Sequence, residues 1–282
     1  YESVTKPIQN FHFIIPITIN FLEILICSSV LVYISKKEDP TTNSRQIFLL
    51  IGLLLIAQIL KINFKTISPL SIIVTPTLII SQGMGTITAL SWVSIALINW
   101  PNSEYGMNEY ILLITFISSC IVAILGGKIR SRAQLLQVSL FVPLGAFIGQ
   151  YLLLGVNNND LYNFNIQNLI SKQGNIISDS FLLATLMLLA IIFMPILESI
   201  FGLVTKARLL ELADQEKPLL RRLSIEAPGT YEHTLLLCGL AEEATRMIGG
   251  NVDLVRAGAL YHDIGKLHAP NWFIENQNGK KN

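Results

Sequence analysis

A short stretch near residue 262 carries the residue types most able to do chemistry. The run ALYHDIGKL, residues 259–267, places a histidine directly beside an aspartate, His262 and Asp263, with Lys266 close behind. Imidazole nitrogen and carboxylate oxygen together suit Mn, Fe or Zn. A lysine ammonium can hold a phosphate oxygen as a point charge. These residue types are therefore compatible with a metal site that acts on a phosphate ester.

The spacing sets a condition on the local structure. Adjacent residues on an α-helix point about 100° apart, so His262 and Asp263 share a partner only where a helix ends. A carboxylate can bridge two metals about 3.5–4 Å apart, with a bridging water as the nucleophile at phosphorus. His233, on the preceding predicted helix, is a third candidate ligand if the two helices pack antiparallel through the Gly249-Gly250 turn.

Each of these residues also has an ordinary interpretation. His262 could interact with the helix dipole at a helix end, with Asp263 as a solvated neighbour. His233 alone fits a partly buried histidine, and Lys266 alone fits a surface lysine. The His-Asp pair by itself favours this ordinary interpretation, so the metal site depends on the combination of elements.

The elements around the candidate residues are predicted to be helical. Leucines recur at helical spacing among charged residues over 209–223. Thr230 is expected to cap the helix that carries His233, and Asn251 to cap the next one. Gly265 is expected to end that next helix beside His262. We find no strand-like alternation, and the fold class predicted for the chain is all-α.

The composition divides the chain into an apolar part and a polar part. The sequence is 51% hydrophobic and 14% charged, against about 25% charged in a soluble domain. About half of all charged residues lie in residues 205–282, where positive and negative charges balance. Nothing indicates a basic surface for a nucleic acid polymer. Three widely separated cysteines fit buried thiols better than a disulfide framework or a zinc cluster: Cys27, Cys120 and Cys238.

The apolar part contains segments long enough to cross a membrane, which takes about 20 residues each. Residues 70–99 are interrupted by a small and polar run at 81–85. The basic loops share one side only if this stretch crosses twice, which gives about seven spans, an outside N-terminus and a cytoplasmic C-terminal part. The predicted apolar stretches are 11–35, 46–62, 70–99, 109–126, 133–156 and 180–204.

Two carboxylates inside these stretches raise the alternative of a transporter. Glu23 and Glu198 could mark an ion pathway. Transporters usually show internal repeats, and we see none in this sequence. This alternative is kept as the less favoured one.

Several longer stretches of the sequence resemble a known family. The stretches EAPGTYEHTLLLCGLAEEA, VRAGALYHDIGKL and PNWFIENQ resemble the HD-domain phosphohydrolases. With PILESIFGLVTKARLLELAD, the chain is similar to the seven-transmembrane HD family of bacterial cyclic-di-AMP phosphodiesterases (PgpH-like). The resemblance is strong over 194–277 and is limited to topology before that.

The resemblance implies a role for each candidate residue. His233, His262 and Asp263 match the positions that bind a two-metal centre, with Mn or Fe favoured. Asp263 and Lys266 would be catalytic, with Lys266 contacting the substrate phosphate. Thr234 stands where serine is usual, and His268 is not part of the pattern.

The resemblance also implies an architecture and a cellular place. The chain would be a multi-pass protein of the plasma or inner membrane, in contact with the lipid bilayer, with a cytoplasmic C-terminal domain; a homodimer is left open. The chain is interpreted as truncated at both ends. The predicted parts are the end of an extracellular region (1–10), a seven-transmembrane region (11–204), a helical junction (205–226) and the N-terminal part of the HD domain (227–282).

The implied function is metal-dependent hydrolysis of cyclic di-AMP to the linear dinucleotide, with a signal entering through the membrane region. We expect the 282-residue chain alone to be inactive. The resemblance places further histidine and aspartate ligands later in the domain, and residues 269–282 contain neither type. The alternative is a membrane sensor or scaffold whose HD domain binds a nucleotide without catalysis. Intact downstream ligands would favour the enzyme.

Overall fold

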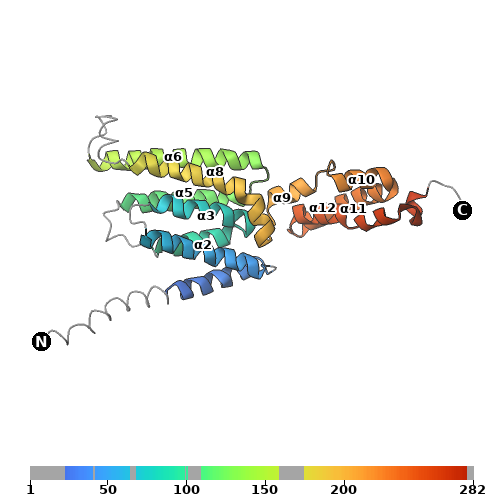
Figure 1. Ribbon diagram of the computed structural model, residues 1–282, viewed down its shortest axis with the longest axis horizontal. Coiled ribbons are helices and arrows are strands. Elements are labelled where there is room, and N and C mark those ends of the chain that lie inside the picture. Colours follow the sequence, from blue (N-terminus) through green and yellow to red (C-terminus); the bar gives the residue numbers. More distant parts are fainter. Residues whose placement is uncertain are drawn as a thin grey trace. The chain divides into compact units, whose positions relative to one another are not determined.

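The described residues are entirely helical or in turns, which confirms the all-α prediction for this part of the chain (Figure 1). The contacts divide the chain into two compact units, Tyr1–Leu203 and Val204–Asn282, here named the first unit and the second unit. The computed structural model describes residues 23–40, 42–63, 68–98, 100, 109–158 and 175–277.

The first unit is a bundle of apolar helices. Among the helices that the structure describes, three contain segments long and apolar enough to cross a membrane: Ser44–Lys61, Arg132–Leu153 and Ile176–Phe201. The number of spans stays a prediction, and the start of the first predicted span lies outside the described residues. The helices are 23–38, α2 (Ser44–Asn63), α3 (Pro69–Gly83), α4 (Thr86–Ile98), α5 (Glu109–Gly126), α6 (Arg132–Asn158) and α8 (Asn175–Phe201).

The stretch 70–99 folds as two helices, α3 and α4, and the break between them is capped. Gly85 has a φ of +102°, a backbone conformation that suits glycine. The carboxylate of Glu38 accepts hydrogen bonds from the backbone N–H groups of Ile87 at 3.1 Å and Thr88 at 2.6 Å. A negative side chain therefore satisfies the free N–H groups at the start of α4.

Helix α3 forms the centre of the first unit. Eleven of its fifteen residues are buried, and it contacts α4, α5 and α8. Trp92 of α4 is completely buried in the same hydrophobic cluster. A helix that is apolar all round suits this central position.

The two carboxylates of the transporter alternative both interact with cations. Arg132 at the start of α6 lies 3.7 Å from Glu198 of α8, whose side chain is only 6% exposed. Glu23 interacts electrostatically with Lys61 at the end of α2. Both carboxylates therefore have cationic neighbours, which favours a structural role for them over an ion pathway.

The second unit is built from short helices. Four are α-helices: α9 (Lys206–Leu212), α10 (Pro218–Glu226), α11 (Pro228–Met247) and α12 (Val252–Tyr261). Helices α11 and α12 pack against each other. Residues such as Leu220, Cys238 and Leu260 lie buried together. Three 3-10 turns complete the unit: η1 (Ile264–His268), η2 (Pro270–Trp272) and η3 (Ile274–Asn276).

One of the two predicted helix caps in this unit is confirmed, and the other is wrong. The side chain of Asn251 accepts a hydrogen bond from the N–H of Leu254 at 3.1 Å, as expected. Thr230, in contrast, lies inside the first turn of α11, whose N-cap is Ala227. The helix starts earlier because Pro228 occupies the first helical position, which suits a residue without an N–H group.

Candidate metal centre

Three of the predicted site residues come together at one end of the α11–α12 pair. His233 lies in the second turn of α11, and His262 and Asp263 follow α12 directly. Their potential ligand atoms all lie within 4.8 Å of one another. Helix α12 ends at Tyr261, not at Gly265 as predicted; Gly265 lies inside η1. Asp263 thus lies in a turn, where it can approach its neighbour's ring.

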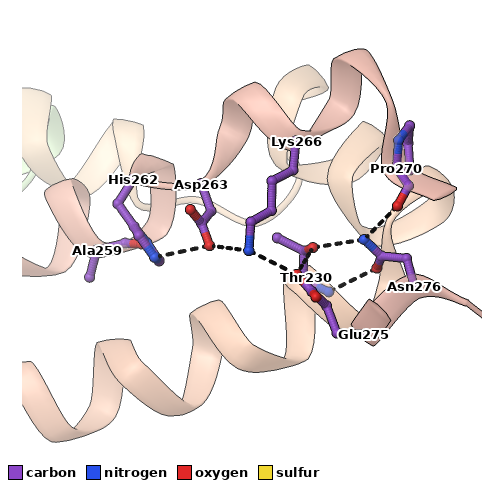
Figure 2. A network of polar contacts seen from close by, with 8 residues as sticks. All are labelled: Thr230, Ala259, His262, Asp263, Lys266, Pro270, Glu275 and Asn276. Atoms are coloured by element: carbon purple, nitrogen blue, oxygen red, sulfur yellow. Dashed lines mark hydrogen bonds and ion pairs between the residues drawn. The ribbon is translucent and has the colours of Figure 1, made fainter. Parts of the chain in front are cut away.

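The hydrogen bonding of His262 leaves one ring nitrogen for a ligand. Nδ1 lies 2.7 Å from the backbone carbonyl of Ala259 (Figure 2). A carbonyl only accepts, so Nδ1 carries the proton in the neutral ring, and Nε2 presents a lone pair. A backbone partner of this kind is typical behind metal-binding histidines.

The atoms facing Nε2 fit a bound cation. Nε2 of His262 lies 3.3 Å from Oδ2 of Asp263. In the neutral ring both atoms are hydrogen-bond acceptors, so their approach is favourable only if a proton or a cation lies between them. His233 adds a second imidazole, with its ring centroid 6.0 Å from that of His262. The donor set of two imidazoles and one carboxylate suits Mn, Fe or Zn.

Lys266 stands between two carboxylates (Figure 2). Its Nζ lies 2.9 Å from Oδ2 of Asp263 and 2.8 Å from Oε1 of Glu275. It also lies 5.0 Å from the centre of the Phe273 ring, within cation–π distance. The hydrogen bonds to Glu275 and Asp263 raise the pKa of Lys266. The hydrogen bond from Lys266 lowers the pKa of Glu275.

Behind Lys266, Asn276 joins η3 to the start of α11. Its side chain accepts from the backbone N–H of Thr230 at 3.0 Å and donates to the Thr230 hydroxyl at 2.9 Å. It also donates to the carbonyl of Pro270 at 3.3 Å. The Thr230 hydroxyl in turn donates to Glu275 at 3.2 Å. These contacts fix the last described segment against the helix that carries His233.

Glu275 and Asn276 belong to the run PNWFIENQ, and no role was predicted for either of them. Glu275 contacts a residue 45 positions away and Asn276 one 46 positions away, which no local spacing reveals. The free N–H groups at the start of α11 were an available signal, because such groups need an acceptor. That requirement does not say which residue supplies one.

The site is open to solvent. His233 and His262 are exposed, and the side chain of Asp263 is 23% exposed. Thr234 is fully buried, and its hydroxyl has no hydrogen-bond partner among the residues described. His268 is exposed and does not belong to the group. A ligand could therefore approach the two imidazoles and Lys266 from water.

Family models match both parts of the chain. One described as a 7TM receptor with intracellular HD hydrolase matches residues 14–205. A model of the HD domain matches residues 230–282. These matches, with the apolar helices of the first unit, make the chain a membrane protein.

Several curated proteins are similar to the chain. The cyclic-di-AMP phosphodiesterase PgpH of Bacillus subtilis is 36% identical over 173 residues, which is 61% of this chain and 24% of that protein. PgpH of Listeria monocytogenes is 51% identical over 83 residues, 29% of this chain and 12% of its own length. The uncharacterized protein slr0104 of Synechocystis is 57% identical over 88 residues, 31% of this chain and 11% of its length. The matches thus span at most about a quarter of these relatives. No solved structure matches the chain.

Proposed function

Because the chain belongs to the family of 7TM receptors with an intracellular HD hydrolase, we propose that it acts as a membrane-anchored, metal-dependent phosphodiesterase. Cyclic di-AMP is the proposed substrate, opened to the linear dinucleotide, since two relatives bear the name cyclic-di-AMP phosphodiesterase. The observation that carries the proposal is the convergence of His233, His262 and Asp263 beside Lys266.

The three ligand residues would hold a two-metal centre, with Mn or Fe as the preferred ions. Such a centre supplies a water-derived nucleophile and neutralises developing charge at phosphorus. His262 would bind through Nε2, the nitrogen that its backbone hydrogen bond leaves available. Asp263 would bind through its carboxylate and orient the ligand set, and His233 would complete it from α11.

Lys266 would hold the phosphate of the substrate. Its ammonium is positive and lies beside Asp263, so a phosphate bound at the metal centre comes within its reach. A lysine in this place stabilises the negative charge that grows on the phosphate oxygens during displacement. Its partial exposure, 23% of the side chain, leaves the ammonium accessible to substrate.

The same family membership supports a cytoplasmic second unit and signal input through the first unit. Lysines and arginines gather at three helix ends on the predicted inner side: at the end of helix 23–38 and the start of α2 (Lys36, Lys37 and Arg45), around the turn between α5 and α6 (Lys128, Arg130 and Arg132), and at the start of α9 (Lys206 and Arg208). Basic loops favour the cytoplasmic side. A signal received by the membrane helices would then reach the hydrolase through the junction 205–226.

The test is hydrolysis of cyclic di-AMP by the protein as its gene encodes it, purified in nanodiscs with Mn²⁺ or Fe²⁺. Asp263→Ala removes a metal ligand, and Lys266→Met removes the phosphate contact. Even the loss of a residue that only hydrogen-bonds to a metal ligand typically costs 10–100-fold in metal affinity or activity, so we expect Asp263→Ala to lower the hydrolysis rate at least ~100-fold. The matched control is Asp214→Ala, an exposed aspartate of the same unit.

Two outcomes decide between the enzyme and the scaffold. Metal-dependent cleavage that is lost in Asp263→Ala and kept in Asp214→Ala supports the phosphodiesterase. A folded protein that binds metal and nucleotide but cleaves no cyclic dinucleotide overturns it and favours a nucleotide-binding sensor.

A further inference from the structure

One carboxylate oxygen at the site has two competing neighbours. Oδ2 of Asp263 faces Nε2 of His262 at 3.3 Å and Nζ of Lys266 at 2.9 Å. A metal ion bound by His262 and Asp263 would need a lone pair of the same carboxylate. The ammonium of Lys266 therefore disfavours metal binding in two ways: it occupies the carboxylate of Asp263, and its positive charge repels the metal ion.

We propose that Lys266 and the metal compete for Asp263, and that Glu275 is a positioning residue that receives Lys266 when the metal binds. This inference rests on the proposed metal centre. It assigns Glu275 a task that acts through Lys266, and it requires no contact of Glu275 with metal or substrate.

The geometry of Lys266 allows this exchange without a large movement. An ammonium has three donors, and Nζ already contacts Glu275 at 2.8 Å while it contacts Asp263. The Phe273 ring adds a further attraction for the ammonium, with its centre 5.0 Å from Nζ. Lys266 can therefore release Asp263 and stay beside the site, where the substrate phosphate would meet it.

Glu275 is held firmly enough to serve as the receiving partner. The Thr230 hydroxyl donates to it at 3.2 Å, and the neighbouring Asn276 is bound to Thr230 and Pro270. At the same place the backbone passes so close that a Cβ on Gly229 would collide with the carbonyl oxygen of Glu275. The carboxylate is thus anchored to the start of α11, the helix of His233.

The inference predicts opposite effects on metal affinity. Without Glu275, Lys266 has Asp263 as its remaining carboxylate contact among the described residues, so Glu275→Gln should weaken metal binding. Without the ammonium, Asp263 is open to the metal, so Lys266→Met should strengthen it. Partly exposed ion pairs have modest energies, so we expect a change of roughly threefold in Kd in each direction.

A charge effect without exchange would give the same signs, so the decisive variant is the double one. Removing a nearby negative charge weakens cation binding at any position, and removing a positive charge strengthens it. If Glu275 acts through Lys266, its loss has no further effect once Lys266 is methionine. If Glu275 acts only by its field, the two effects add.

The experiment titrates the protein as its gene encodes it, in nanodiscs, with Mn²⁺, and follows the paramagnetic resonance signal of the free ion. Four forms are compared: wild type, Lys266→Met, Glu275→Gln and the double variant. A second cycle uses Arg246→Met and Glu243→Gln, an exposed ion pair of α11 with a 2.7 Å contact, and should leave Kd unchanged. Circular dichroism checks that each form is folded.

We expect Lys266→Met and the double variant to have the same Kd for Mn²⁺, lower than that of wild type. The Kd of Glu275→Gln should be higher than that of wild type. Additive changes in the cycle, or an unchanged Kd in Lys266→Met, overturn the exchange while the metal centre stands. If no form binds Mn²⁺, or if Asp263→Ala binds it as well as wild type, the proposed metal centre is contradicted. The exchange of Lys266 between the two carboxylates is then contradicted as well.

Discussion

Buried threonines within helices and buried threonines at helix starts form different hydrogen bonds in the two units. Within helices they bond locally: in the first unit Thr77 donates to the carbonyl of Ile73 and Thr115 to that of Ile111, each at 2.7 Å, and in the second unit Thr245 donates to the carbonyl of Ala241. At helix starts they bond to distant residues: Thr88 in the first unit to Glu38, 50 residues away, and Thr230 in the second unit to Asn276, 46 residues away. Apolar helices in a bilayer have no water to satisfy polar groups, so a hydroxyl there is satisfied by a carbonyl of its own helix. The second unit uses polar contacts between distant segments to fix its site.

The first unit has cross-helix polar contacts at the ends of its helices. Glu38 caps α4, Arg132 pairs with Glu198, and Gln46 donates to the carbonyl of Gly202 at 2.9 Å. In the predicted topology these three contacts lie on the side that the basic residues predict to be cytoplasmic. The polar contacts between helices of the first unit thus lie at helix ends, and Thr77 and Thr115 in its apolar interior bond within their own helices.

The largest expected effect is the loss of the distant contact at Asn276. Asn276→Ala leaves the N–H of Thr230 without its acceptor, at a residue that is only 9% exposed. An unsatisfied buried group costs about 1–3 kcal/mol. Thermal unfolding in nanodiscs should show a lowered midpoint for the second unit. Asn271→Ala, an exposed asparagine nearby, should show none; equal effects would contradict the comparison.

A smaller loss is expected at the polar end of the first unit. Glu38→Ala removes the acceptor for the N–H groups of Ile87 and Thr88, and losing a helix cap costs about 0.5–2 kcal/mol. Glu38→Gln keeps an acceptor without the charge and should lie between wild type and alanine. Fluorescence in detergent can follow the unfolding of the three forms. Identical unfolding midpoints would show that Glu38 does not stabilise the start of α4.

The apolar interior should tolerate the loss of a local hydroxyl bond. Thr77→Val keeps the shape of the side chain and removes both the donor and the need for it, since the Ile73 carbonyl is also a helix acceptor. Hydrogen bonds between membrane helices average about 0.6 kcal/mol, and we expect less for a bond within one helix. A shift of the unfolding midpoint as large as that of Glu38→Ala would show that the local hydroxyl bond matters as much as the contact at the helix end.

The smallest effect concerns an exposed ion pair of the second unit and depends on pH. Arg222 donates to Glu226 at 2.6 Å, and this hydrogen bond lowers the pKa of Glu226. The pair therefore contributes stability above the unfolded pKa, about 4.3, and loses it as the pH falls through the lowered folded value. In chemical unfolding at pH 7, the free energy of unfolding of wild type should be slightly higher than that of Glu226→Gln, and the difference should vanish in acid. A stability difference that grows as the pH falls would contradict this prediction.

The helical class and the His233–His262–Asp263 group were predictable from the sequence. Apolar runs and caps such as Asn251 are local signals, and bringing His233 to the His-Asp pair needed only the antiparallel packing of the two helices that the Gly249-Gly250 turn joins. The break near Gly85 was predictable too, because small and polar residues interrupt an apolar stretch.

Contacts between distant residues were not predictable in the same way. Nothing near Glu275 or Asn276 in the sequence indicates that Thr230 and Lys266 are their partners, since the tertiary fold creates those contacts. The start of α11 was misplaced for a related reason. Thr230 is itself in the first turn, and its N–H finds its acceptor in the distant Asn276, a contact that no local signal indicates.

The close passage of Gly229 and Glu275 has a consequence for sequence variation in the family. A side chain at position 229 would collide with the backbone of the segment that holds Lys266, and moving a backbone disturbs every residue attached to it. Gly239 and Gly258, on the two neighbouring helices, face open space. Across relatives that keep the His-Asp pair, position 229 should therefore stay glycine, and this contact places no such demand on positions 239 and 258.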